Sequence, residues 1–256
     1  MNPVRIALLG ASGRMGQAVL DAAAGQAELR IVTAVVGQGS ASLHKTSHGL
    51  TYTSDIASAL AGADVLVDFS LPESTAKALE ACLAAGKPLV TGVTGMDAAL
   101  KARLAEAGRR IPVLAAPNMS LGVALLSRMA EQAAKVLGPD FDIEISEAHH
   151  KHKKDAPSGT ALGLAEVMSK ARGHGVPAPG TDRRGLREPG SIGFSVVRAG
   201  DIVGEHTVLF AGAGERLELS HKAQSRATFA HGALRAAHWI AGKPAGSYTL
   251  ADTLQA

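Results

Sequence analysis

The sequence predicts an α/β fold with two domains: a parallel sheet with helices on both faces, and a smaller α+β domain with a mixed sheet. Two observations predict the parallel sheet. Short apolar runs alternate with helical segments over residues 1–120, and a glycine-rich loop follows the first of these runs. A third observation predicts the mixed sheet, because three strand-like runs follow one another between residues 192 and 221 without a helical segment between them. A chain of 256 residues has the length for two such domains.

The first half of the chain alternates strands and helices in a regular order. Strands are predicted at Val4–Leu9, Leu29–Val36, Val65–Phe69, Pro88–Thr91 and Val113–Ala115. Helices are predicted at Gln17–Ala24, Asp55–Leu60, Ser74–Ala85 and Ala98–Ala107. Parallel strands need long crossover connections, and helices in these positions supply them.

The pattern changes after Asn118. A helix is predicted at Gly122–Leu137, a strand at Asp142–Ser146 and a further helix at Ser158–Arg172. The segment Gly173–Gly190 is rich in Gly, Pro and Arg and is predicted to be a long loop. The three consecutive strands are Ile192–Ala199, Ile202–Ala211 and Arg216–His221, and Thr228–Ala241 is a closing helix.

Composition and charge exclude several classes of protein. The chain has 26 Lys and Arg residues, 23 Asp and Glu residues and only 3% aromatic residues, so we expect no nucleic-acid partner. The single cysteine, Cys82, excludes a disulfide framework within the chain and is typical of a reducing compartment. No targeting segment is visible, and no apolar stretch approaches the ~18 residues of a membrane-spanning helix. We therefore expect a cytoplasmic protein without a membrane partner.

The glycine-rich loop is the sequence Gly10-Ala-Ser-Gly13-Arg-Met-Gly16, between the first strand and the first helix. Glycines allow a tight turn and close approach to a pyrophosphate, and the helix start offers free N–H groups to that anion. We therefore interpret the loop as the dinucleotide site of a Rossmann-type domain rather than as an ordinary glycine-rich turn. One expected feature is missing. The second strand ends in Val36-Gly37, where such sites commonly have an acidic residue that binds the ribose hydroxyls.

The most informative segment is E-I-S-E-A-H-H-K-H-K-K-D-A-P-S-G-T-A, which covers residues 144–161. Pro and Ser are typical of helix starts, so the backbone N–H groups of Ser158, Gly159 and Thr160 are expected to face an anion. Three histidines and three lysines just before them add positive charge and titratable protons. We interpret the segment as a catalytic pocket for a small anionic substrate, with His and Lys side chains as acids.

Three other interpretations of this segment are weaker. A nucleic-acid patch needs more basic residues and aromatic side chains. A solvated charge run rarely leads into a capped helix start. A metal site built on His149 and His152 lacks a matching cluster of ligands elsewhere in the sequence, so no metal is expected.

Residues 144–161 closely resemble the signature of the 4-hydroxy-tetrahydrodipicolinate reductase family, also called dihydrodipicolinate reductases. The resemblance spans nearly the whole chain, because further segments follow in family order. These segments are Gly10–Gly16, Val90–Gly95, Ala116–Ser120 and R-A-G-D-I-V-G-E-H at Arg198–His206.

The resemblance implies roles for individual residues. His149 and Lys153 match the family's proton-transfer groups, and His150, Gly159 and Thr160 match substrate contacts, next to the helix start at Ser158. The segments that match cofactor contacts are Gly10, Ala11, Ser12, Gly13, Arg14 and Met15; Gly92, Val93 and Thr94; and Ala116, Pro117, Asn118 and Met119. The chain departs from the family at Val36-Gly37, where many members have an acid followed by Arg, and at Leu71, where some have Arg. These departures leave the choice between NADPH and NADH open.

The resemblance also implies a reaction and an assembly. The family reduces a cyclic imine dicarboxylate with NADPH or NADH in lysine and diaminopimelate biosynthesis. Members are cytoplasmic homotetramers in which residues equivalent to 121–227 bind substrate and form the tetramer. The equivalents of residues 1–120 bind the dinucleotide, and residues 228–256 complete that domain. Closure of the two domains would exclude water from the reaction.

Two alternatives remain open at this stage. Another two-domain reductase, such as an amino-acid or semialdehyde dehydrogenase, shares this domain plan, although the His-His-Lys-His-Lys segment is evidence against it. A nucleotide-sensing protein on the same scaffold has no need for a capped His/Lys site. Oxidation of the cofactor on addition of the preceding pathway enzyme's product discriminates among these three.

Overall fold

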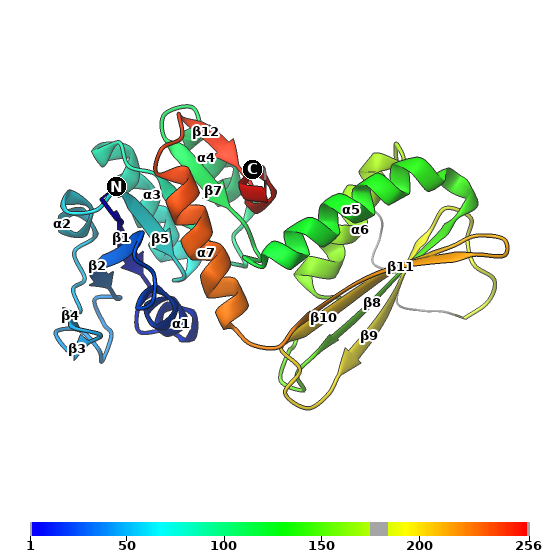
Figure 1. The fold of residues 1–256 in the computed structure, drawn as a ribbon, viewed down its shortest axis with the longest axis horizontal. Coiled ribbons are helices and arrows are strands. Elements are labelled where there is room, and N and C mark those ends of the chain that lie inside the picture. Colours follow the sequence, from blue (N-terminus) through cyan, green and yellow to red (C-terminus); the bar gives the residue numbers. More distant parts are fainter. Residues whose placement is uncertain (1, 175–183, 255–256) are drawn as a thin grey trace. The chain divides into compact units, whose positions relative to one another are not determined.

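The computed structural model describes residues 2–174 and 184–254, and the chain divides into two units. The first unit comprises Met1–Leu121 and Arg226–Ala256, and the second comprises Gly122–Ser225. Figure 1 labels the helices and strands of both units. The part of the predicted loop Gly173–Gly190 that covers residues 175–183 lies outside the described residues, and its described flanks contain no helix or strand.

The first unit is built on a six-stranded parallel sheet with the order β12-β7-β6-β5-β1-β2. Its strands are β1 (Val4–Leu9), β2 (Leu29–Val35), β5 (Val65–Asp68), β6 (Leu89–Thr91), β7 (Pro112–Ala115) and β12 (Gly246–Tyr248). The chain moves outward from β1 to β2 and then crosses back to β5 and β6, so the strand order reverses between β1 and β5. In open α/β sheets this reversal is where ligands bind, at the carboxyl ends of the strands.

Helices cover both faces of this sheet, as the sequence predicts. One face packs against α2 (Ile56–Ala61), α3 (Pro72–Ala85) and α4 (Ala98–Ala107), where Leu66 and Leu89 meet Leu79 and Leu104. The opposite face packs against α7 (Ala227–Ile240), which lies beside α1 (Arg14–Ala23) in Figure 1. Parallel strands buried on both faces need apolar residues at consecutive positions, which explains the uninterrupted run Ile6–Leu9.

Three short elements of the first unit carry no periodic signal in the sequence. A two-stranded hairpin joins β3 (Thr46–Ser47) to β4 (Leu50–Thr51), with His48 at φ 53° and Gly49 at φ 73° in the turn. The edge strand β12 follows α7 and pairs in parallel with β7. A 3-10 helix, η2 (Leu250–Leu254), follows β12.

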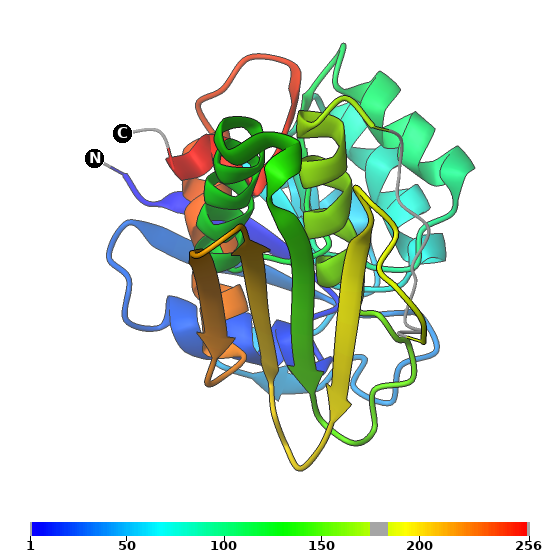
Figure 2. The same ribbon diagram turned by 90° about the vertical axis from the view of Figure 1, so that its right-hand side faces the viewer.

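The second unit contains a four-stranded mixed sheet with the order β11-β10-β8-β9, visible face-on in Figure 2. The strands are β8 (Asp142–His149), β9 (Ile192–Arg198), β10 (Gly204–Ala211) and β11 (Arg216–Ala223). Strand β10 runs antiparallel to β8 and β11, whereas β8 and β9 run parallel. The predicted mixed sheet is therefore confirmed.

Two helices pack on one face of this mixed sheet. They are α5 (Leu121–Leu137), which a 3-10 helix, η1 (Gly138–Asp140), follows, and α6 (Gly159–Ala171). Leu126 of α5 and Met168 of α6 share a buried cluster with Ile145, Phe194 and Val208 of the sheet. Because side chains alternate along a strand, Glu147 and His149 project from β8 toward the same face as Ile145.

Candidate active site

The end of β8 brings the predicted proton-transfer histidine beside a buried carboxylate. Strand β8 continues to His149, three residues beyond the predicted end at Ser146. Glu147 is only 2% exposed, although it is charged. A buried carboxylate needs charge-assisted hydrogen bonds to offset its lost hydration.

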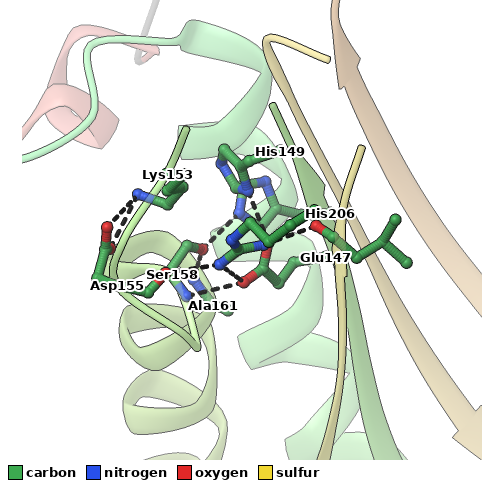
Figure 3. Close-up of polar contacts among 9 residues, drawn as sticks. Glu147, His149, Lys153, Asp155, Ser158, Ala161 and His206 are labelled. Carbon is green, nitrogen blue, oxygen red and sulfur yellow. Dashed lines mark hydrogen bonds and ion pairs between the residues drawn. The ribbon is translucent and has the colours of Figure 1, made fainter. Parts of the chain in front are cut away.

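Four hydrogen bonds converge on the Glu147 carboxylate (Figure 3). The Arg198 guanidinium donates from Nη1 to Oε2 and from Nη2 to Oε1, both at 2.7 Å. His149 Nδ1 lies 2.6 Å from Oε2, and the backbone N–H of Ser158 donates to Oε1 at 3.0 Å. Burial raises the pKa of Glu147, but the hydrogen bonds from Arg198, His149 and Ser158 outweigh it and leave the pKa below its ordinary value.

His149 has a defined donor and acceptor nitrogen in this arrangement. An ionised carboxylate only accepts hydrogen bonds, so His149 donates from Nδ1. In the neutral imidazole the other ring nitrogen, Nε2, is then the acceptor. Burial lowers the pKa of His149 and outweighs the opposite effect of Glu147, so the neutral imidazole predominates at neutral pH.

The start of α6 joins the same network. Ser158 is the N-cap residue of α6, and its Oγ accepts a hydrogen bond from the backbone N–H of Ala161 at 3.2 Å. The same Oγ lies 3.0 Å from Nε2 of His206, whose ring meets the His149 ring edge-on at 5.2 Å between centroids. Burial lowers the pKa of His206 to about 4, so this second histidine is neutral.

The predicted lysine lies in the loop that connects β8 to α6. Lys153 Nζ contacts the Asp155 carboxylate at 2.8 and 2.9 Å. Arg198 Nη2 donates to the Asp155 backbone carbonyl at 2.6 Å, which ties this loop to β9. The His150 ring lies 6.3 Å from the His152 ring, and both belong to the same loop.

The remaining predicted substrate residues occupy the first turn of α6. Gly159 and Thr160 directly follow the cap residue Ser158. A Cβ placed on Gly159 meets no atom within 4 Å, so this helix start has open space beside it. The structure therefore brings His149, Ser158 and the first turn of α6 together in the second unit.

The predicted cofactor residues of the first unit share one edge of the parallel sheet. Gly10–Met15 follow β1, Gly92–Thr94 follow β6, and Ala116–Met119 follow β7, and these three strands all run in the same direction. Gly10 has φ +80°, and a Cβ there meets the Phe69 carbonyl oxygen at 2.5 Å, so a side chain would disrupt the turn. Helix α1 begins after Gly13 without a side-chain cap hydrogen bond. Its first N–H groups fit a pyrophosphate.

Sequence reasoning assigned no role to several residues that organise these segments. Arg198 and His206 lie in a recognisable family segment, but their contacts with Glu147 and Ser158 join residues about 50 positions apart. In the first unit, the buried Asp68 accepts hydrogen bonds from Thr75 and Thr91, and Thr91 Oγ1 in turn accepts the Val93 N–H at 3.3 Å. Asp68 thereby braces the segment Gly92–Thr94.

Within residues 2–174 and 184–254, no group of three or more His, Cys, Asp or Glu side chains is arranged to hold a metal ion. Across the same residues, no helix has the length and apolar character to cross a membrane.

Two family models match this chain, one for each half. Residues 4–119 match the N-terminal part of dihydrodipicolinate reductase, and residues 122–254 match its C-terminal part. A curated 4-hydroxy-tetrahydrodipicolinate reductase from Thiobacillus denitrificans is 52% identical and covers 98% of each chain. Its counterpart from Anaeromyxobacter dehalogenans is 45% identical and covers 98% of this chain and 97% of the relative.

Solved structures show the same fold. Dipicolinate-bound dihydrodipicolinate reductase from Paenisporosarcina sp. superposes with a TM-score of 0.77 at 24% identity, covering 96% of this chain and 97% of that chain. A diaminopimelate dehydrogenase from C. glutamicum gives a TM-score of 0.58 at 15% identity, covering 98% and 94%. The sequence matches over both halves decide the assignment: this chain belongs to the dihydrodipicolinate reductase family.

Proposed function

We infer that this chain reduces 4-hydroxy-tetrahydrodipicolinate to tetrahydrodipicolinate and water, with a reduced nicotinamide as hydride source, in lysine and diaminopimelate biosynthesis. The observation that carries this inference is the match over 98% of the chain to relatives that bear this enzyme name. His149 and Lys153 are the acid groups, and the start of α6 is the anion site, that the reaction requires.

The first unit fits a dinucleotide. Its helix α1 begins at a glycine without a side-chain cap, and Gly10 leaves the backbone free of a Cβ where the turn meets Phe69. We assign the pyrophosphate to the N–H groups at this helix start and the rest of the cofactor to the segments Gly92–Thr94 and Ala116–Met119. When bound, a reduced nicotinamide supplies a hydride to the unsaturated ring of the substrate.

The second unit supplies the proton. Loss of water from the substrate leaves a ring imine conjugated to a carbon–carbon double bond. Once hydride reaches the ring carbon remote from nitrogen, negative charge spreads toward nitrogen and the adjacent carbon must be protonated. We assign this proton to His149 and Lys153, which lie at the end of β8 and in the loop after it.

The substrate carries two carboxylates that need cationic or N–H partners. We assign one anion site to the first turn of α6, where Gly159 and Thr160 follow the cap residue Ser158, with His150 in the loop that precedes this helix. Ser158 is already committed to capping and to Glu147, so its contribution is to hold the turn in place. Gly159 is bordered by open space, which leaves room for a ligand.

Three further properties belong to this proposal. We place the enzyme in the cytoplasm, where lysine biosynthesis takes place in the family, and as a homotetramer. We also expect it to accept NADPH readily, since Val36-Gly37 provides no carboxylate to repel a 2′-phosphate.

A coupled assay tests the proposed reaction. The substrate is generated by the enzyme that condenses pyruvate with aspartate semialdehyde, and oxidation of NADPH or NADH is followed after this chain is added. We expect oxidation that depends on both the condensing enzyme and this chain. Oxidation with aspartate semialdehyde alone, or none with the condensed product, would contradict the proposal.

A further inference from the structure

We propose that Glu147 is a positioning residue for the proton-transfer step: its buried carboxylate orients His149 through Nδ1 and ties it to both the α6 start and the Lys153 loop. The inference rests on the proposed function, because it concerns the proton donor of that reaction. It assigns to Glu147 and Arg198 a role beyond that of an internal ion pair.

The hydrogen bonds of Glu147 show what the carboxylate holds. Each oxygen accepts one N–H of Arg198 and one further donor. The further donor is His149 Nδ1 for Oε2, at 2.6 Å, and the Ser158 backbone N–H for Oε1, at 3.0 Å. One rigid group therefore fixes the imidazole relative to the first turn of α6, which is the proposed anion site.

Arg198 extends the same arrangement to the lysine. Its Nη2 donates to Glu147 and also to the Asp155 carbonyl oxygen at 2.6 Å. Asp155 in turn pairs with Lys153 through its side chain. The two proposed acids are therefore connected through a single buried carboxylate and a single guanidinium, whose planar fork matches a carboxylate geometrically.

The geometry also decides which nitrogen of His149 is available. Glu147 can only accept, so the neutral imidazole carries its proton on Nδ1 and presents an unprotonated Nε2. Strand β10 leaves room there, since a Cβ placed on Gly204 would lie 3.2 Å from Nε2. Nε2 is thus the atom that takes up a proton to form the imidazolium and then delivers it to the substrate, and the Glu147 charge favours that protonated form.

Charged and titratable groups surround His149 from each neighbouring element. Glu147 lies on β8, Arg198 on β9, His206 on β10, and Lys153 in the following loop. Burial lowers the pKa of His149, Glu147 raises it, and Lys153 and Arg198 lower it. Removal of the Glu147 charge should therefore move the titration of His149 to lower pH.

Histidine nitrogen NMR of the free wild-type protein gives the first test. Long-range proton–nitrogen correlations report which ring nitrogen carries the proton in the neutral form. We expect the Nδ1-protonated tautomer for His149. A neutral His149 protonated on Nε2 would overturn the proposal, and this measurement requires neither a variant nor a substrate.

The second test compares Glu147→Gln with a matched control, Glu205→Gln. Glu205 belongs to β10 of the same sheet, and its carboxylate lies 3.5 Å from the exposed Lys222. In Glu147→Gln we expect the His149 titration midpoint to fall and kcat to drop at least about tenfold, with the KM for the cofactor unchanged. The control should match wild type in all three.

The outcomes separate positioning from a structural role. Partial unfolding lowers the amount of active enzyme but leaves the tautomer and the titration midpoint of His149 in the folded fraction unchanged. Glu147→Gln with wild-type tautomer and midpoint would therefore refute the proposal. Should wild-type protein fail to reduce the substrate, the proposed function is wrong, while the NMR result on His149 still decides what Glu147 does.

Discussion

At the scale of single residues, the cost of burying charge distinguishes Glu147 from the other ion pairs. Surface pairs such as Arg103–Glu80 and Lys135–Glu131 are half exposed and contribute at most about 1 kcal/mol each. Glu147 is fully withdrawn from water, and loss of one partner from a buried pair typically costs about 3–5 kcal/mol. Substitutions at Arg198 should therefore affect stability as well as activity, whereas those at the surface pairs should affect neither strongly.

Truncation of the proposed acids tests their assignment. We expect Lys153→Ala to lower kcat about 100-fold or more, the usual effect of losing a general acid, and His149→Gln to lower it as well. Cofactor affinity should remain near wild type, since the cofactor segments belong to the first unit. Lys154→Ala is the matched control, because it removes an exposed lysine next in sequence. Wild-type turnover in both test variants would show that the proton comes from elsewhere.

The buried His206 makes stability depend on pH. Its pKa is about 4 in the folded protein and about 6.5 when unfolded, so the unfolded chain binds more protons between these values. The stabilisation is complete above pH 6.5 and is lost as pH falls toward 4, by about 2 kcal/mol between pH 7 and pH 5. Urea unfolding of wild type and His206→Gln at both pH values measures it. Equal losses in the two proteins would contradict this assignment.

At the scale of helices and strands, the sequence predicts the elements that depend on contacts between near neighbours in the chain. The glycine loop and the start of α6 follow from short-range turn and capping chemistry, and both are confirmed as elements. Strand β8 was predicted too short because Glu147 interrupts the apolar alternation. The partner that permits this charge in a strand, Arg198, lies 51 residues further along the chain, where no local pattern reveals it.

The sequence does not reveal the edge strand β12 or the hairpin of β3 and β4, for a related reason. Strand β12 has three residues, Gly246–Tyr248, and pairs on one side only, so it needs no apolar run. The hairpin of β3 and β4 is held by its turn and by two backbone pairs rather than by a buried side-chain pattern. Elements defined by hydrogen bonding to a distant neighbour leave little periodicity in their own sequence.

The first turn of α6 allows a test of substrate binding. A side chain at Gly159 enters open space, so Gly159→Leu should fold normally and obstruct the anion site. We expect the KM for the dicarboxylate to rise at least about tenfold, with the KM for the cofactor little changed. Gly163→Leu, one turn further along α6 and also without neighbours within 4 Å, is the control. Equal effects on both ligands would exclude this turn as the substrate site.

The end of β2 tests the cofactor preference. Val36 is 3% exposed, so its side chain faces the core, whereas a Cβ on Gly37 meets nothing within 4 Å. Wild type should not prefer NADH by more than about tenfold in kcat/KM, or about 1.4 kcal/mol. Gly37→Arg should shift the ratio toward NADPH by about tenfold, since arginine binds phosphate through charge-assisted bonds. Gly25→Arg, before β2, is the matched control, and an equal shift there would indicate a nonspecific charge effect.

At the scale of the whole molecule, the second unit has a sheet face that its own helices leave uncovered. Both α5 and α6 pack on the face that carries Ile145 and Phe194. The other face presents Thr207, Ser220 and Val197, and neither α5 nor α6 packs on it. Val197 is 49% exposed on this face. A sheet of four strands with one open face that includes apolar side chains is suited to pairing with another copy of the chain.

The family resemblance implies a homotetramer, and we expect this open face of the second unit to be the surface on which it assembles. Light scattering at micromolar concentration should give about four times the chain mass of 26.1 kDa. Val197→Asp places a charge on the open face and should shift the mass toward smaller species, because a buried unpaired carboxylate weakens an interface by several kcal/mol. Val136→Asp makes the same change on α5, where Val136 is 72% exposed, and should leave the mass unchanged. A monomeric wild type would reject the tetramer. A tetramer that tolerates Val197→Asp but not Val136→Asp would instead place the contact on α5.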